Sequence, residues 1–246
     1  MIKSLKRTLG LILSNKVNKS ETSNVSGKVV VVTGGSRGLG LDLCNFLVMA
    51  GAKVYYLSRK NSGSNKAVHV STDITNLEDI LKSVQKIESL EKCVDVLINN
   101  AAVTESGGFE NLDILSLETA LSTNIKAPVV ISSKFLPLLK ESRAPLIINV
   151  GSKISRNPNI SDNKVIYAVT KYSMEGLSNA LRSSLRQYGI RVVCILPGTI
   201  NTQFSLKSGD FISSGDVSRA ISFVIENSNI DFENFVVKGK FQENVG

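Results

Sequence analysis

A tyrosine and a lysine four residues apart form the first pair in the sequence that could carry out a proton transfer. Tyr167 and Lys171 lie in a stretch with helical spacing, so both side chains fall on one face of the expected helix. A free tyrosine has a pKa of ~10, and a neighbouring ammonium group lowers it by stabilising the phenolate. The pair would therefore suit general acid/base catalysis on an alcohol or a ketone. Taken alone, it is more typical of a surface tyrosine beside a solvated lysine.

A glycine-rich turn offers a second kind of chemistry, the binding of a phosphate. The segment Thr-Gly-Gly-Ser-Arg-Gly-Leu-Gly, residues 33–40, joins an apolar run to a helical stretch. Glycines let the backbone approach a ligand closely, and the helix N-terminus provides free N–H groups and the positive end of the helix dipole. The spacing differs from the common dinucleotide fingerprint, and a turn without a ligand is the alternative. Its place after the first apolar run favours a nucleotide.

Strands and helices that alternate along the chain must position these two segments. Short β-branched runs predict strands at residues 28–33, 53–57, 67–70, 94–98, 146–150, 191–196 and 235–237. Helical spacing predicts helices over residues 39–50, 76–90, 124–140, 165–188 and 216–226, with one more before residue 124. Such alternation implies right-handed crossovers and an α/β fold. We expect a single-domain Rossmann fold over residues 25–246, a doubly wound parallel β-sheet with helices on both faces.

The distribution of charge argues against nucleic-acid binding. The 246 residues have a net charge of +8, of which residues 1–20 contribute five basic residues and no acid. The remainder is close to balanced and has no basic stripe with interleaved aromatic residues. No apolar run approaches the ~20 residues of a membrane-spanning helix.

Cysteine and histidine usage argues against a metal site. His69 is the only histidine, and Cys44, Cys93 and Cys194 have no cysteine or histidine neighbour at metal-ligand spacing. All three cysteines stand in apolar segments, so we expect buried, reduced thiols in an intracellular protein. We accordingly expect a cytoplasmic protein without a metal.

The first 24 residues form an extension and linker with three alternative roles. Apolar residues of this extension fall on one side of a helical wheel, and the following segment is polar. It could be a cleaved organellar presequence, which would place the protein in the mitochondrion or plastid. It could be an amphipathic helix that brings residues 1–20 onto an anionic membrane surface. The third alternative is a poorly ordered tail.

Together the two motifs resemble the short-chain dehydrogenase/reductase family, over about residues 27–238. Four further segments match the family in order. The segment Asn-Asn-Ala-Ala, residues 99–102, follows the fourth strand, with alanine in place of the family's final glycine. Asn124 begins the next long helix, Ser152 follows the fifth strand, and a Pro-Gly-Thr-Ile-Asn-Thr segment at residues 197–202 follows the sixth.

The resemblance implies a role for each of four residues. Tyr167 would give a proton to a carbonyl or take one from an alcohol, and Lys171 would lower its pKa and bind the nicotinamide ribose. Ser152 would orient the substrate oxygen, and Asn124 would hold a water in a proton relay. The residues alone also allow simpler roles, a turn-capping hydroxyl for Ser152 and a helix N-cap for Asn124.

The cofactor implied is NADP(H). An NAD site usually has an acid at the end of the second strand, but this chain has Ser58, Arg59 and Lys60 there. Arg59 and Arg37 could bind a 2′-phosphate; the alternative is two solvated surface arginines. The full set of implied cofactor-binding residues is Gly34, Ser36, Arg37, Gly38, Leu39, Gly40, Ser58, Arg59, Asp73, Asn99, Ala101, Tyr167, Lys171, Pro197, Gly198, Ile200 and Thr202.

The function implied is that of an NADP(H)-dependent oxidoreductase, which interconverts a ketone and a secondary alcohol. The substrate would be a small molecule, either a 3-ketoacyl thioester or a small 3-hydroxy acid or sugar. The alternative function is a catalytically silent NADP(H)-binding sensor or scaffold. The resemblance also implies a homodimer or homotetramer, paired through the helices that begin near Asn124 and Val165.

Overall fold

A computed structural model describes residues 25–61, 66–104, 108–200 and 211–239 of the chain. The expectations for residues 1–24 and for Thr202 concern positions outside these ranges. Within them, every helix is too short or too polar to cross a membrane.

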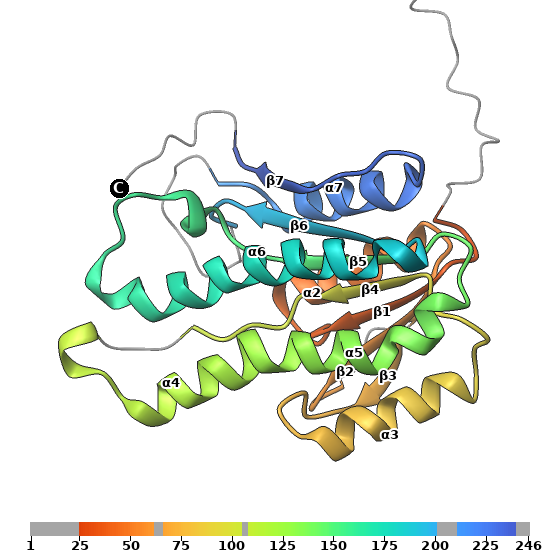
Figure 1. The fold of residues 1–246 in the computed structure, drawn as a ribbon, viewed down its shortest axis with the longest axis horizontal. Coiled ribbons are helices and arrows are strands. Elements are labelled where there is room, and N and C mark those ends of the chain that lie inside the picture. Colours follow the sequence, from red (N-terminus) through yellow and green to blue (C-terminus); the bar gives the residue numbers. More distant parts are fainter. Residues whose placement is uncertain (1–24, 62–65, 105–107, 201–210, 240–246) are drawn as a thin grey trace, which may run out of the picture.

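A parallel β-sheet of seven strands forms the centre of the described structure (Figure 1). The strand order is β3-β2-β1-β4-β5-β6-β7, and every neighbouring pair is parallel. The strands are β1 (Val29–Thr33), β2 (Lys53–Ser58), β3 (Val68–Ser71), β4 (Val96–Asn99), β5 (Leu146–Val150), β6 (Arg191–Pro197) and β7 (Asn234–Val237). Because the order reverses between β1 and β4, this is the doubly wound arrangement expected from the sequence.

Helices cover both faces of the sheet (Figure 1). One face packs against α2 (Gly38–Met49) and α7 (Ser214–Glu226). The other packs mainly against α3 (Leu77–Glu88), α5 (Ala127–Lys140) and α6 (Val165–Leu185). A further helix, α4 (Ile114–Leu121), precedes α5. The sheet is therefore the middle of three layers, as parallel strands buried on both faces require.

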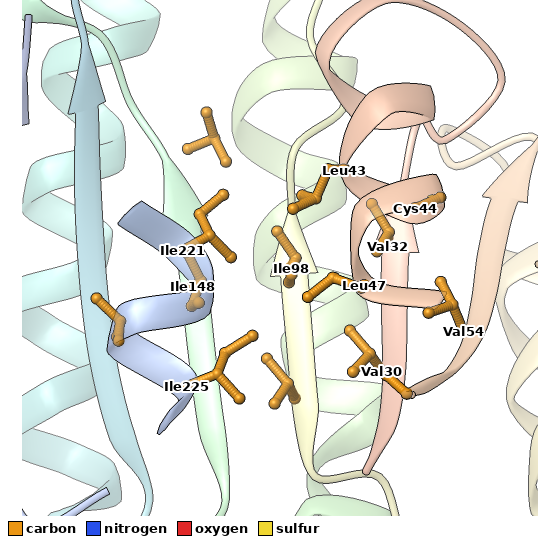
Figure 2. Close-up of a cluster of buried hydrophobic side chains, with 14 of the residues drawn as sticks. Val30, Val32, Leu43, Cys44, Leu47, Val54, Ile98, Ile148, Ile221 and Ile225 are labelled. Atoms are coloured by element: carbon orange, nitrogen blue, oxygen red, sulfur yellow. The ribbon is translucent and has the colours of Figure 1, made fainter. Parts of the chain in front are cut away.

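The apolar core explains why these segments form these elements. All five residues of β1 are buried, and their side chains alternate between the two faces of the sheet. Figure 2 shows one of the two resulting clusters, where Leu43 and Leu47 of α2 and Ile221 of α7 lie over the strands. Helix starts are set locally: the Asn76 side chain accepts from the backbone N–H groups of the first turn of α3.

Two expectations from the sequence were wrong. Asn124 does not begin a helix, because α4 and α5 are joined by a π-helical turn (Ser122–Lys126) that contains it. A π turn inserts an extra residue, which shifts the apolar periodicity, so that one continuous helical stretch looks like two separate helices in the sequence. Cys93 is only half-buried, whereas the other two cysteines are buried. Since β4 begins at Val96, Cys93 lies in the loop before the strand.

Candidate active site

A large cavity lies where the strands end. Its volume is about 2170 Å³, and its lining comes from the segments that follow β1, β2, β3, β4, β5 and β6, together with α4 and the start of α6. The carboxyl edge of a doubly wound sheet, next to the point where strand order reverses, is where such folds bind ligands. Of the residues expected to bind a cofactor, those that line it are Gly34, Ser36, Arg37, Gly38, Leu39, Gly40, Ser58, Arg59, Asp73, Ala101, Tyr167, Lys171, Pro197, Gly198 and Ile200.

The glycine-rich turn is locked against the loop that follows β4. The Thr33 hydroxyl oxygen accepts from the backbone N–H groups of Asn100 and Ala101, both at 3.0 Å. Gly34 has a φ of +71°, and a Cβ there would lie 2.9 Å from the Ala101 Cα. A Cβ on Gly40 would lie 2.2 Å from the Gly34 carbonyl oxygen. These two glycines are therefore required by close packing of backbone on backbone.

Gly38 faces the cavity in a different environment. It opens α2 with a φ of +53°, and apart from its chain neighbours and the backbone of its own helix no atom lies within 4 Å of the place where a Cβ would be. The first turn of α2 contains no acidic residue, so its N–H groups and positive dipole end are not neutralised by a carboxylate there. An open backbone at a helix N-terminus fits the phosphates of a dinucleotide.

The end of β2 provides cationic groups to the same cavity. Arg59 and Lys60 are exposed, and the buried Ser58 hydroxyl donates to the Lys60 carbonyl oxygen at 2.6 Å. Asp73, after β3, accepts from the Thr75 hydroxyl and backbone N–H at 2.7 and 2.9 Å. These hydrogen bonds, helped by the charge of Arg59, hold the pKa of Asp73 below its usual value. Arg37, Arg59 and Lys60 thus give this part of the cavity three basic side chains, and Asp73 gives it one carboxylate that is held by hydrogen bonds.

Tyr167 and Lys171 both line the cavity from α6. The Lys171 Nζ lies 5.7 Å from the centroid of the Tyr167 ring and donates to the Val150 carbonyl oxygen at 2.9 Å. Lys171 is only 4% exposed, and burial lowers its pKa to about 8. The fold thus holds, beside a phenol, a lysine whose pKa is shifted toward neutral pH but which is still mostly protonated at pH 7.

Ser152 lines the cavity from the segment after β5. Its hydroxyl oxygen accepts from the Ile154 backbone N–H at 3.3 Å, so the turn-capping role considered from the sequence is present. This bond leaves the hydroxyl proton available for a ligand. The segment is held to α6 by Glu175, which accepts from the Ser155 hydroxyl and pairs with Arg156.

Asn124 is 2% exposed and does not line the cavity. Its amide nitrogen donates to the Val103 carbonyl oxygen at 2.8 Å and to the Thr170 hydroxyl at 3.1 Å. Its amide oxygen accepts from the Val103 backbone N–H at 2.9 Å. The helix N-cap alternative is therefore wrong, and the side chain ties the π turn to the loop after β4 and to α6. The amide oxygen of Asn124 keeps a second lone pair, which could accept a hydrogen bond from a water.

Asn99 was expected to bind the cofactor, but this last residue of β4 turns its side chain toward the helices on one face of the sheet and does not line the cavity. Its amide nitrogen donates to the Asn149 amide oxygen at 2.8 Å and to the Ser132 hydroxyl at 3.0 Å. The Asn149 amide nitrogen donates to the Ser178 hydroxyl of α6 at 2.8 Å. Asn100 lines the cavity instead, because successive side chains at a strand end point to opposite faces.

Three residues with clear structural roles in the site were missed from the sequence. They are Thr33, Asn100 and Thr170, each identified above by its hydrogen bonds. The signal for Thr170 was its place directly before Lys171, which puts it on the inner side of α6. Thr33 and Asn100 belong to the two motifs noted in the sequence, but neither was given a role of its own.

Comparison with known proteins agrees with this geometry. The family model described as short chain dehydrogenase matches residues 28–211. "Ketoacyl reductase HetN" of Nostoc sp. is 26% identical over 85% of this chain and 79% of its own length. "Acetoacetyl-CoA reductase" of Synechocystis sp. is 28% identical over 73% of this chain and 74% of its own. In fold, the chain is similar to a short chain dehydrogenase of Leptospira borgpetersenii with bound NAD+, with a TM-score of 0.82, 24% identity and coverage of 93% and 98%.

Proposed function

Because the chain belongs to the short-chain dehydrogenase/reductase family of nicotinamide-binding oxidoreductases, we propose that it interconverts a ketone and a secondary alcohol with NADP(H). The observation that carries the proposal is that Tyr167, Lys171 and Ser152 line the same cavity as the glycine-rich turn. The names of two relatives, a ketoacyl reductase and an acetoacetyl-CoA reductase, support a ketone as the oxidised substrate.

Three features of the chain support the proposal of NADP(H) rather than NAD(H). The turn at Gly38 would receive the pyrophosphate, and Arg37 and Arg59 would bind the 2′-phosphate, since a guanidinium matches phosphate oxygens in bidentate geometry. The segment that directly follows β2 has no acid to bind ribose hydroxyls. When bound, the cofactor supplies or accepts the hydride.

Tyr167 would act as the general acid in reduction and the general base in oxidation. Its hydroxyl gives a proton to the carbonyl oxygen, and the Lys171 cation stabilises the phenolate that is left. The Val150 carbonyl holds the ammonium group in place. With a pKa of about 8, Lys171 exchanges protons readily near neutral pH. Ser152 donates a hydrogen bond to the same substrate oxygen, which favours the charge that develops on it.

We further propose that the protein assembles as a homodimer or homotetramer through α4, α5 and α6. Leu121, Val129, Val169 and Tyr172 on these helices are apolar and exposed. Exposed apolar groups gathered on one part of a surface favour a protein partner. Light scattering at micromolar concentration should give at least twice the chain mass of 26.6 kDa. A monomer under those conditions would contradict this assembly.

The decisive experiment follows NADPH oxidation by absorbance with a panel of ketones, in the wild type and in Tyr167→Phe. The panel contains 3-oxoacyl thioesters, keto acids, keto sugars and quinones. We expect turnover by the wild type, and no turnover but almost unchanged NADPH affinity in the variant. Full activity in the variant would remove Tyr167 from the mechanism. Tight NADPH binding without any turnover would favour a sensor.

A further inference from the structure

Glu175 of α6 continues the row of side chains that begins with the two candidate catalytic residues of that helix. Tyr167, Lys171 and Glu175 follow one another at intervals of four residues, so they lie along one side of α6. The Glu175 side chain is only 12% exposed, yet it is not among the residues that line the cavity. Withdrawing a carboxylate from water costs free energy unless the charge is paired, so the partners of Glu175 indicate its role.

Both oxygens of the Glu175 carboxylate are engaged by the segment that follows β5. Oε1 accepts from the Ser155 hydroxyl, and Oε2 pairs with the Arg156 guanidinium. The Asn234 amide nitrogen of β7 also donates to Oε2, at 3.4 Å. Glu175 therefore joins the helix that carries Tyr167 to the loop that carries Ser152.

Ser155 transmits this contact to Ser152. The two residues belong to one 3₁₀ turn (Lys153–Arg156), for which Ser152 is the N-cap. The Ser152 carbonyl oxygen accepts from the Ser155 backbone N–H at 3.1 Å and lies 2.8 Å from the Ser155 hydroxyl oxygen. A hydroxyl has one proton and a carboxylate is the stronger acceptor, so the hydroxyl serves Glu175 while the backbone N–H keeps its bond to Ser152.

A second attachment to the same helix lies on the other side of Ser152. Lys171 holds the end of β5, two residues before Ser152, by the hydrogen bond described above. Glu175 holds the chain three residues after Ser152. Because both attachments come from α6, they fix the backbone around Ser152 relative to Tyr167.

We propose that Glu175 is a positioning residue, which acts through Ser155 to keep the Ser152 hydroxyl where it and Tyr167 can hold one substrate oxygen. The inference rests on the proposed function, since it concerns the group that would hold the ketone or alcohol. Misplacing a reacting or polarising group by about 1 Å can lower a rate about 100-fold. Loss of Glu175 should slow turnover and leave cofactor binding intact, because the glycine-rich turn follows a different strand, β1.

The test measures kcat, KM and the NADPH dissociation constant in the wild type, Glu175→Ala and Ser155→Ala. The substrate is a ketone that the wild type reduces, and NADPH binding is followed by fluorescence. Each variant should lower kcat about 10- to 100-fold and change NADPH affinity by less than about twofold. Since both remove one contact, the double variant should be no slower than the slower single variant. Glu175→Gln keeps an oxygen for the Ser155 hydroxyl, so its kcat should stay within about threefold of the wild type.

Glu91→Ala is the matched control. The Glu91 side chain is 11% exposed, accepts from the Tyr55 hydroxyl and pairs with Lys53, so its burial and partners resemble those of Glu175. Lys53 begins β2, which places this cluster at the edge of the sheet opposite the cavity. Glu91→Ala should lower the free energy of unfolding in urea about as much as Glu175→Ala, and keep the wild-type kcat.

A wild-type kcat in Glu175→Ala would overturn the inference, as would a loss of turnover that Glu175→Gln does not relieve or that Glu91→Ala shares. Losses that multiply in the double variant would count against it equally. In each of these cases the proposed function stands, because the wild type still reduces a ketone. If the wild type binds NADPH but reduces no ketone in the panel, the proposed function fails and the inference fails with it.

Discussion

Replacing Lys171 by methionine removes a cation that the fold holds almost entirely out of water. In the folded protein burial lowers the pKa of this lysine to about 8, against 10.5 for an ordinary lysine. Between these two values the unfolded chain binds a proton that the folded protein does not. Raising the pH through this window therefore stabilises the wild type relative to the methionine variant. More than about one unit below pH 8 both states are protonated, and the difference is constant.

The size of the effect follows from the two pKa values. One pKa unit corresponds to about 1.4 kcal/mol, so the free energy of unfolding of the wild type, minus that of Lys171→Met, should rise by about 2–3 kcal/mol between pH 7 and pH 10. The hydrogen bond to the Val150 carbonyl is also lost in the variant. Loss of that hydrogen bond changes the free energy of unfolding by nearly the same amount at every pH, so the rise with pH stays almost unchanged.

Urea unfolding of both proteins at four pH values from 7 to 10 measures this difference directly. Titrations common to the two proteins cancel in the subtraction. Lys86→Met, which removes an exposed lysine of α3, should show no comparable rise. Parallel stability curves for wild type and Lys171→Met would refute the reasoning, because they would mean that the Lys171 pKa is the same in the folded and unfolded chain.

Gly40→Ala should destabilise the fold by about 1–3 kcal/mol in urea unfolding, because its Cβ would overlap the Gly34 carbonyl oxygen. Gly38→Ala should cost only about 1 kcal/mol, for its left-handed φ, yet weaken NADPH binding in a fluorescence titration; equal stability losses would contradict the contrast. Arg37→Ala combined with Arg59→Ala should weaken NADPH about tenfold or more and leave NADH unchanged, and equal losses would dismiss the 2′-phosphate assignment. A thiol reagent should modify one cysteine per folded chain, and none in Cys93→Ser. The reason is that burial raises the pKa of the Cys44 thiol to about 12 and that of the Cys194 thiol to about 11. Three fast-reacting thiols in the native protein would argue against this packing.

The strands and most helices could be predicted because their signals are local. Parallel strands buried on both faces appear as short apolar runs, and β5 was expected over the same residues that form it. The observed helix ends differ from the expected ones by a few residues where a capping side chain sets the end. For α7, Ser213 and Asp216 form a reciprocal capping box, so the helix starts two residues before its expected position.

The parts of the site that were missed depend on contacts between distant segments. The π turn around Asn124 accompanies hydrogen bonds to Val103, 21 residues earlier in the chain. Whether Asn99 or Asn100 faces the cavity depends on the side of the sheet to which each points where β4 ends. Residue spacing within one helix correctly predicted that Tyr167 and Lys171 lie together. It carries no information about contacts between distant segments or about the direction of a side chain at the end of a strand.

A row of hydrogen-bonded polar side chains between the sheet and α6 limits which substitutions leave the site geometry intact. Asn99 of β4, Asn149 of β5 and Ser178 of α6 are joined by hydrogen bonds, which connect the strand that leads to Ser152 with the helix that carries Tyr167. Apolar contacts are non-directional and permit neighbouring elements to slide, whereas hydrogen bonds restrict both distance and angle. A homologue with leucine in place of Asn149 would fill the core and fold, although the buried Asn99 amide nitrogen would lose one of its two partners, at a cost of about 1–3 kcal/mol. It would nonetheless let its serine and tyrosine drift in separation, and so lose turnover before it lost its fold.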